Sequence, residues 1–210
     1  MTYSQFGQDD EIVKFFNGKT NGWFIDIGAH LSGNDTILLE KMGWSGVCVE
    51  PCDDLFENLK KIRSCVCENV CIGNIDGEID FCWNTGYISA LSGVMEYYCP
   101  EHMQRINSEN NIYGGKTAVI KKRIQTLTSL LQQLNSPTHI ELLKIDVEGG
   151  EYAVIEGTDF SKYTFDLITI EANYRHEYER CKKLLNSKGY EEFKIVGIDV
   201  FFKRKLNESQ

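Results

Sequence analysis

The stretch that decides the fold is WFIDIGAHLSG, residues 23–33. Its first five residues form a short apolar run with an aromatic pair and two isoleucines, which predicts a buried β-strand. The run breaks at Gly28 into a loop of small residues, and a helical pattern begins near Asn34. Glycines at positions 28 and 33 can adopt backbone angles that other residues resist and let a ligand approach the main chain closely. The stretch therefore predicts a strand, a ligand-binding turn and the start of a helix.

Three residues around this turn indicate which ligand it binds. A dinucleotide-binding turn needs three glycines spaced G-x-G-x-x-G, and His30 occupies the second position, where a pyrophosphate requires bare backbone. Asp26, at the end of the strand, repels phosphate and accepts hydrogen bonds, directly or through water, from a ligand ammonium. The next apolar run ends in Glu50, which is placed to accept hydrogen bonds from the two hydroxyls of a ribose. An ammonium, a ribose and no phosphate predict S-adenosylmethionine.

The composition limits the partners that the chain can have. Its 210 residues are 42% apolar, which supports a single α/β domain with a sizeable core. The 22 basic and 31 acidic residues give a net charge of −9, so nucleic acid and anionic membranes are unfavourable partners. No apolar stretch reaches the roughly twenty residues that span a bilayer, and the first residues lack the basic and apolar regions of a signal peptide. We therefore expect a soluble, cytoplasmic protein.

The eight cysteines contain no C-x-x-C pair, so the usual zinc spacings are missing. In an unsecreted chain they should stay reduced and act mostly as small core residues. A metal site built from Cys65, Cys67 and Cys71 is an alternative, although alternation along a strand is sufficient to explain that cluster.

Strand and helix patterns alternate along the chain, which predicts a mostly parallel sheet with helices on both faces. Further strands are expected at 46–50, 65–72, 78–83, 140–147 and 165–173, with a closing antiparallel hairpin over 190–203. Helices are expected in the N-terminal segment 1–22 and at 34–42, 53–62, 127–134, 151–155 and 174–185. Between them, residues 84–123 mix aromatic residues with glycines and show no single periodicity. A long aromatic segment of this kind predicts a lid or acceptor-binding insertion, with bounds of 84–125.

Polar residues follow the predicted strands at their carboxyl ends, where a parallel sheet binds its ligands. These residues are Asp26, Glu50, Asp146, Glu148, Glu171 and Asn173. Any one of them could simply cap a strand. Acids at four successive strand ends instead predict a functional edge of the sheet.

A family resemblance rests on seven segments, which occur in order between residue 4 and about residue 202. They are SQFGQD (4–9), FIDIGAH (24–30), NDT with LE (34–36 and 39–40), GWSGVCVEP (43–51), LSG (91–93), LKIDVEG with Glu151 (143–149), and IEAN (170–173). Together they resemble the FkbM-type methyltransferases. The resemblance implies a class I, Rossmann-like fold with a seven-stranded sheet, and S-adenosylmethionine-dependent O-methylation of sugar or other small-molecule or glycan hydroxyls.

The resemblance also adds the N-terminal residues to the cofactor site. From the residues alone, Ser4 and the acids after it predict only an N-capped amphipathic helix. The full set of expected cofactor contacts is Gln5, Gln8, Asp9, Asp26, Gly28, Ala29, His30, Glu50, Pro51 and Asp146.

Methyl transfer requires an acceptor oxygen aligned with the methyl carbon and a base that removes its proton. Candidates for the catalytic groups are His30, Asp146, Glu148 and Glu171. For His30, a fixed hydrogen-bonding role in the cofactor loop is an equal alternative. The other histidines, His102, His139 and His176, lie in no pattern that indicates chemistry, and Lys144 is expected to form a structural ion pair.

Magnesium is a possible but not favoured cofactor, since Asp146, Glu171 and Asn173 offer three oxygen ligands. Two other functions remain open. A non-catalytic S-adenosylmethionine-binding protein would carry the same pocket residues. An NAD-dependent oxidoreductase is less favoured, because of His30 and the terminal hairpin.

Overall fold

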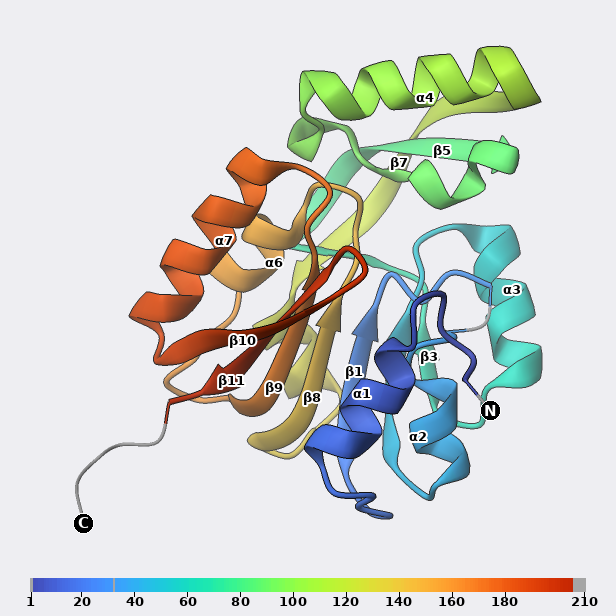
Figure 1. Cartoon of the computed structure of the whole chain (residues 1–210). Helices are drawn as coiled ribbons and strands as arrows, with labels where there is room; N and C mark the ends of the chain where they lie inside the picture. The colour runs from blue at the N-terminus through green and yellow to red at the C-terminus, as the bar shows by residue number, and fades with distance from the viewer. Residues whose placement is uncertain (1, 32, 206–210) are drawn as a thin grey trace.

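The computed structural model describes residues 2–31 and 33–205. Seven strands form the main sheet in the order β10-β11-β9-β8-β1-β2-β3 (Figure 1). Their bounds are β1 (Trp23–Ile27), β2 (Ser45–Val49), β3 (Val66–Glu68), β8 (His139–Ile145), β9 (Thr164–Glu171), β10 (Tyr190–Val196) and β11 (Asp199–Arg204). The pairs from β3 to β9 are parallel, whereas β11 pairs antiparallel with both β9 and β10. The predicted fold class is confirmed, including the terminal hairpin.

Helices cover both faces of this sheet. One face carries α1 (Gln8–Phe15), α2 (Ile37–Lys41) and α3 (Asp53–Ile62), and the other carries α5 (Leu127–Gln133), α6 (Glu151–Glu156) and α7 (Arg175–Ser187). Strand β1 shows how the sequence divides the core, because successive side chains of a strand point to opposite faces. Phe24 packs with Leu39 and Leu59 on the first face, whereas Ile25 packs with Leu130 on the second.

A second sheet, in the order β4-β7-β5-β6, lies above the carboxyl ends of the main strands (Figure 1). Its elements are β4 (Cys71–Gly73), β5 (Gly77–Gly86), the 3-10 helix η1 (Tyr87–Leu91), β6 (Gly93–Val94), the 3-10 helix η2 (Met95–Tyr97), α4 (Pro100–Tyr113) and β7 (Gly115–Thr126). We call the part of it over residues 77–126 the roof. Helix α4 runs across the roof, and its Ile106 packs with Ile88 and Leu91 of η1.

The expectation that residues 84–123 are irregular was wrong. They contain the 14-residue helix α4 and most of the 12-residue strand β7. Both elements bury little: only His102 and Ile106 of α4 are buried, and the first nine residues of β7 are exposed or half-buried. Periodicity in a sequence reports burial on one face, so nearly unburied elements leave no periodic signal.

Two other element boundaries also differ from the prediction. Residues 65–72 form two strands in different sheets, because the Asn69 side-chain amide donates to the carbonyls of Glu50 and Pro51, each at 3.1 Å, and turns the chain. Helix α2 begins at Ile37 and not near Asn34, since a turn closed by the Thr36 N–H and the Gly33 carbonyl precedes it. Thr126 caps α5, because its Oγ1 accepts from the Ser129 N–H at 3.1 Å.

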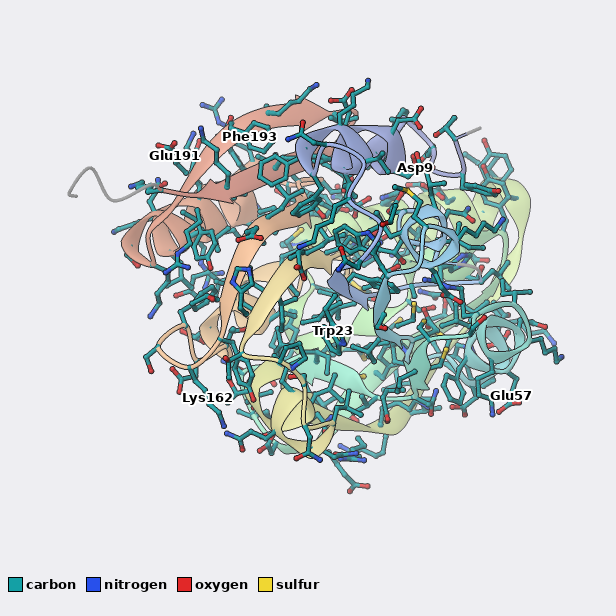
Figure 2. All side chains as sticks on the ribbon, turned by 90° about the horizontal axis from the view of Figure 1, so that it is seen from below. Asp9, Trp23, Glu57, Lys162, Glu191 and Phe193 are labelled. Atoms are coloured by element: carbon teal, nitrogen blue, oxygen red, sulfur yellow. The ribbon has the colours of Figure 1, made fainter. Side chains whose placement is uncertain are left out.

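Charged side chains surround the molecule when it is seen from below the main sheet (Figure 2). Glu57, Lys162 and Glu191 mark this rim, whereas Trp23 lies near the centre of the view. Among residues 2–31 and 33–205, no helix has both the length and the apolar character needed to cross a bilayer.

Candidate active site

A cavity of about 490 Å³ lies between the main sheet and the roof. The loops after β1, β2 and β8 contribute Gly28, Glu50 and Asp146 to its wall, and the roof contributes Tyr87 and Arg105. Most of the polar edge that the strand ends predicted therefore lies at the floor of this cavity. Two of its six residues are exceptions: Asp26 does not line the cavity, and Asn173 lines a separate, much smaller pocket beside α7.

The loop after β1 is fixed by main-chain packing. Gly28 has a φ of +81°, and a Cβ atom there would lie 1.6 Å from the carbonyl oxygen of Asp146. The N–H groups of Gly28 and Ala29 both donate to the carbonyl of Val49, at 2.9 and 3.0 Å. This turn needs glycine because a side chain would strike the neighbouring strand end.

Glu50 holds the same loop from the end of β2. One carboxylate oxygen accepts from the His30 N–H and the other from the Cys52 N–H, both at 2.8 Å. The side chain is buried, and this burial raises the pKa of Glu50 to about 7, against the effect of the two N–H donors. Pro51, between these partners, lines the cavity with Glu50.

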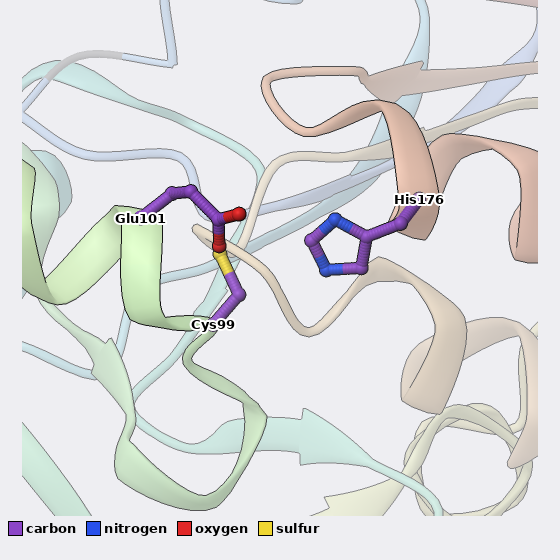
Figure 3. A group of neighbouring side chains, drawn as sticks. All are labelled: Cys99, Glu101 and His176. Carbon is purple, nitrogen blue, oxygen red and sulfur yellow. The ribbon is translucent and has the colours of Figure 1, made fainter.

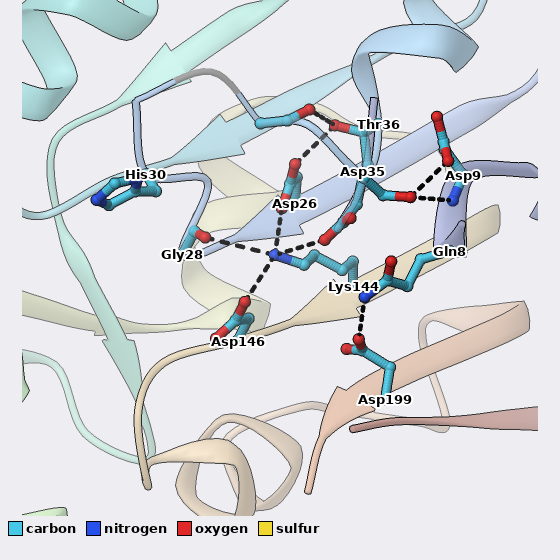
Figure 4. A network of polar contacts seen from close by, with 12 residues as sticks. Gln8, Asp9, Asp26, Gly28, His30, Asp35, Thr36, Lys144, Asp146 and Asp199 are labelled. Carbon is cyan, nitrogen blue, oxygen red and sulfur yellow. Dashed lines mark hydrogen bonds and ion pairs between the residues drawn. The ribbon is translucent and has the colours of Figure 1, made fainter. Parts of the chain in front are cut away.

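Lys144 joins the ends of β1 and β8 to the loop that carries Asp35, under the cavity (Figure 4). Its Nζ lies 3.2 Å from an Asp146 oxygen, 3.3 Å from Asp35 and 3.4 Å from Asp26, and it donates to the Gly28 carbonyl at 3.5 Å. Burial acts to lower the pKa of Lys144, but the carboxylates around it keep that pKa well above its usual value. The expected structural ion pair is confirmed.

Asp26 and Asp9 are buried and bonded within the protein. Asp26 accepts from the Thr36 hydroxyl at 2.6 Å, and Asp9 accepts from Ser4 and from the Tyr3 N–H at 2.7 Å. Within the described part of the chain, neither residue lines the cavity. They position the β1 loop and the N-terminal segment that do line it.

The other two N-terminal residues of the expected site do line the cavity. Gln5 is exposed at its edge, and Gln8 is buried in its wall. The Gln8 side-chain amide donates to Asp199 of β11 at 2.6 Å and so ties α1 to the last strand (Figure 4). Burial raises the pKa of Asp199 to about 7.

Three carboxylates, those of Asp146, Glu148 and Glu171, come within 4.8 Å of one another at the ends of β8 and β9. Oxygen atoms at this spacing could hold a divalent cation, with Glu148 in the place that the sequence predicted for Asn173. Asn173 instead donates to Glu171. The Lys144 ammonium, 3.2 Å from Asp146, already supplies positive charge beside this group.

Glu148 is the least satisfied of these acids. Its Oε2 atom is buried and has no hydrogen-bond partner among the described residues; the nearest basic groups are the His102 imidazole, at 3.6 Å, and the Arg105 guanidinium, at 3.9 Å. Burial, followed by the charge of Asp146, raises the pKa of Glu148 well above its usual value. The same two effects raise the pKa of Glu171. A raised pKa makes the ionised form of a carboxyl group a stronger base, so each of these groups can accept a proton from a substrate once it is ionised.

Two histidines stand near these groups. His30 lines the cavity with a φ of +54°, its Nε2 is buried without a partner among the described residues, and burial lowers its pKa. His102 of α4 is fully buried between the Tyr174 hydroxyl, 3.0 Å from Nδ1, and the Leu91 carbonyl, 3.3 Å from Nε2. Its Nε2–H must donate to that carbonyl, so Nδ1 accepts from Tyr174.

Sequence reasoning missed several residues of the cavity wall: Asp35, Tyr87, Arg105, Glu109 and Asp199. Asp35 directly follows the predicted loop and could have been included on that ground. The others come from the roof and the last strand, where no motif marks a site.

The charge of the cavity fits a cationic ligand. Seven carboxylates line it, those of Asp35, Glu50, Glu109, Asp146, Glu148, Glu171 and Asp199, against the two cations Arg105 and Lys144. An excess of acids attracts a ligand that carries a sulfonium and an ammonium and repels a pyrophosphate. Together with the strand order and the terminal hairpin, this cavity defines a class I S-adenosylmethionine-dependent methyltransferase.

The chain belongs to the methyltransferase FkbM domain family, whose model matches residues 26–204. This confirms the family resemblance seen in the sequence. None of the curated proteins matches the chain.

Solved structures of similar fold include two methyltransferases of low sequence identity. The ribosomal protein L11 methylase from Lactobacillus delbrueckii subsp. bulgaricus is 11% identical, covering 95% of this chain and 78% of that chain, with a TM-score of 0.48. A TehB-like SAM-dependent methyltransferase from Corynebacterium glutamicum is 10% identical, covering 96% and 89%, with a TM-score of 0.46.

Proposed function

We propose that the protein transfers the methyl group of S-adenosylmethionine to a hydroxyl of a sugar or of another small-molecule or glycan acceptor. One observation carries this proposal. Glu148, buried and without a hydrogen-bond partner among the described residues, lines a cavity that the cofactor loops and the roof share. A carboxylate in that place can accept the proton of an acceptor hydroxyl that is held between the cofactor loops and the roof.

The cofactor half is formed by the loops after β1 and β2. Glu50 is suited to bind the ribose hydroxyls, and the backbone of Gly28 and Ala29 leaves room for close approach. Gln5 and Gln8 close the same side from the N-terminal segment. When bound, S-adenosylmethionine supplies an electrophilic methyl group on its sulfonium.

Buried Asp9 and Asp26 support this half indirectly. Asp9 orders the segment that carries Gln5 and Gln8, and Asp26 anchors Thr36 and Lys144 behind the β1 loop. Both aspartates therefore contribute to cofactor binding by holding its contacts in place.

We assign the acceptor half to the roof, which overlaps the insertion predicted over residues 84–125. Tyr87 is 62% exposed and presents an aromatic face on which a sugar ring can stack. Arg105 and Glu109, paired at 2.8 Å, line the same half and offer hydrogen-bond donors and acceptors to hydroxyls. The acidic excess favours a neutral acceptor over an anionic one.

Four residues serve the acceptor oxygen. Glu148 accepts the proton; burial and the neighbouring Asp146 raise the pKa of its carboxyl, and the Glu171 carboxylate lies beside both. His30 lines the cavity, its Nε2 has no hydrogen-bond partner among the described residues, and it holds either the hydroxyl or the cofactor. Alignment of the oxygen within the cavity supplies much of the acceleration.

Transfer of a radiolabelled methyl group tests the proposal. Purified protein is incubated with methyl-labelled S-adenosylmethionine and a panel of neutral glycans, free sugars and small alcohols, with acidic sugars and amines as comparison. We expect label in a neutral hydroxyl compound that resists mild base, as a methyl ether does and a methyl ester does not. Label only in amines or carboxylates would contradict O-methylation, and cofactor binding without any turnover would favour a non-catalytic binding protein.

A further inference from the structure

Three metal-binding side chains meet outside the cavity, where α4 approaches α7 (Figure 3). Cys99 directly precedes α4, Glu101 lies in its first turn, and His176 lies in the first turn of α7. The Cys99 sulfur, a Glu101 carboxylate oxygen and an imidazole nitrogen of His176 all lie within 4.8 Å of one another.

We propose that Cys99, Glu101 and His176 bind a zinc ion that joins the roof to α7. A thiolate, an imidazole and a carboxylate are the three donor types that zinc takes in proteins, and a water molecule can occupy the fourth tetrahedral position. Tetrahedral zinc with ordinary bond lengths holds such donor atoms about 3.4–3.6 Å apart. Closing the present spacing to that value needs shifts of about 1 Å, which the exposed side chains of Glu101 and His176 can make.

Cys99 is buried at the start of α4, so the exposed side chains of Glu101 and His176 are the ones that would move toward it on metal binding. On binding, the zinc–sulfur bond replaces the S–H bond, and the proton leaves to solvent.

His176 is exposed, and its Nε2 lies 3.6 Å from the carboxylate of Glu177, which is itself paired with Arg180 at 2.8 Å. The unpaired charge that favours a divalent cation at this site is therefore that of Glu101.

A zinc ion at this site would fix the position of α4, in the roof, relative to α7, which packs on the main sheet. One turn into α4, His102 already contacts Tyr174 at 3.0 Å, directly before α7. A zinc ion at Cys99 would add a second link beside that contact. Because α4 also carries Arg105 into the cavity, the ion would hold the acceptor half in position. This proposal does not depend on which acceptor the protein methylates.

The full-length protein, freed of metal with a chelator, is titrated with zinc chloride by calorimetry and with cobalt chloride by absorption. We expect one equivalent of zinc to bind, and the cobalt form to show a sulfur-to-cobalt charge-transfer band. Removing a residue that only hydrogen-bonds to a metal ligand weakens metal binding by about ten- to a hundredfold. Cys99→Ser and His176→Ala each remove a ligand itself, so each should weaken zinc binding at least tenfold. Both should remove the charge-transfer band or weaken it.

Two control variants separate this site from other cysteines and histidines. Cys65→Ser removes a half-buried thiol elsewhere, and His139→Ala removes an exposed histidine paired with Asp166, so both should bind zinc like the wild type. Absence of zinc binding by the wild type, or wild-type binding by His176→Ala, would overturn the proposal. Because His176 is exposed, His176→Ala is expected to fold. Its zinc affinity therefore tests the proposed site even if Cys99→Ser does not fold.

Discussion

Glu148 is held in an unusual state by its neighbours. It has a φ of +57°, it is 8% exposed, and its Oε2 atom has no hydrogen-bond partner within the described chain. Leaving a buried carboxylate oxygen unpaired destabilises the fold, and strain of this kind concentrates at functional sites. The proposed role as proton acceptor accounts for both features.

Replacing Glu148 by Gln should therefore lower kcat by about 10²–10⁴-fold, because the amide cannot take the hydroxyl proton. Binding of S-adenosylhomocysteine should change little, since Glu50 and the β1 loop stay intact. Glu156→Gln is the matched control, because Glu156 ends the adjacent helix α6 and bonds to Asn74 at the surface. Steady-state kinetics of both variants check the assignment; a fully active Glu148→Gln enzyme would rule Glu148 out as the base.

Individual residues were predictable where the chain repeats a strand-end pattern. His30, Glu50, Asp146 and Glu148 all line the cavity, as expected from their places after β1, β2 and β8. Asp26 has the same kind of position, yet it does not line the cavity: one of its oxygens accepts from the Thr36 hydroxyl, and the other lies 3.4 Å from the Lys144 ammonium. A sequence shows that an acid ends a strand but not which partners its side chain will find.

The β1 loop is the element on which the cofactor half depends. Gly28→Ala should destabilise the protein by more than about 3 kcal/mol, because the new Cβ would overlap the Asp146 carbonyl in addition to the usual penalty of about 1–2 kcal/mol for a positive φ. Gly18→Ala is the control: its φ is +71°, and nothing lies within 4 Å of the added Cβ. Urea unfolding measures both, and equal destabilisation would show that the close approach at Gly28 is unimportant.

The roof is the element that should select the acceptor. Tyr87→Ala should raise the KM for the acceptor about tenfold or more, since base- or sugar-sized rings stacked on an aromatic face contribute on the order of 1–3 kcal/mol. Affinity for S-adenosylhomocysteine should stay the same. Ile112→Ala is the control, because Ile112 is equally exposed on α4 but does not line the cavity among the described residues. Equal effects of both variants, or loss of cofactor affinity with Tyr87→Ala, would contradict the assignment.

The more residues of a helix or strand are buried, the better that element could be predicted from the sequence. β1 and β8 bury nearly every residue and were found within one or two residues of their ends. In α4 and in β7 only two residues each are buried, and both elements were missed. Pro100 at the first turn of α4 and Gly114 at its end were the remaining signals, and both were read as marks of a loop.

The whole molecule carries buried acids whose protonation links folding to pH. Burial raises the pKa of Glu50, Glu151 and Asp199 to about 7, from ordinary values near 4. The folded protein therefore holds these protons to a higher pH than the unfolded chain, and their contribution to stability is lost as pH rises through about 7. Burial lowers the pKa of His30 and His102, so below about pH 6.5 these histidines act in the opposite direction.

The free energy of unfolding should consequently fall by about 2 kcal/mol between pH 6.5 and pH 8. Chemical denaturation at several pH values measures the slope. Glu151→Gln should reduce the slope, since one of the groups with a raised pKa is removed, whereas exposed Glu57→Gln should leave it unchanged. Stability that is constant or rises over this window would contradict the raised pKa values.

Calorimetric titration with S-adenosylhomocysteine tests the central claim most directly. The wild type should bind one equivalent, and Glu50→Ala should weaken binding at least about tenfold, because two hydrogen bonds to a charged group are lost. Glu68→Ala, at the end of neighbouring β3 and outside the cavity wall of the described chain, should bind like the wild type. Saturable binding that depends on Glu50 would establish the cofactor and its site, whereas no binding, or equal binding by Glu50→Ala, would contradict the account.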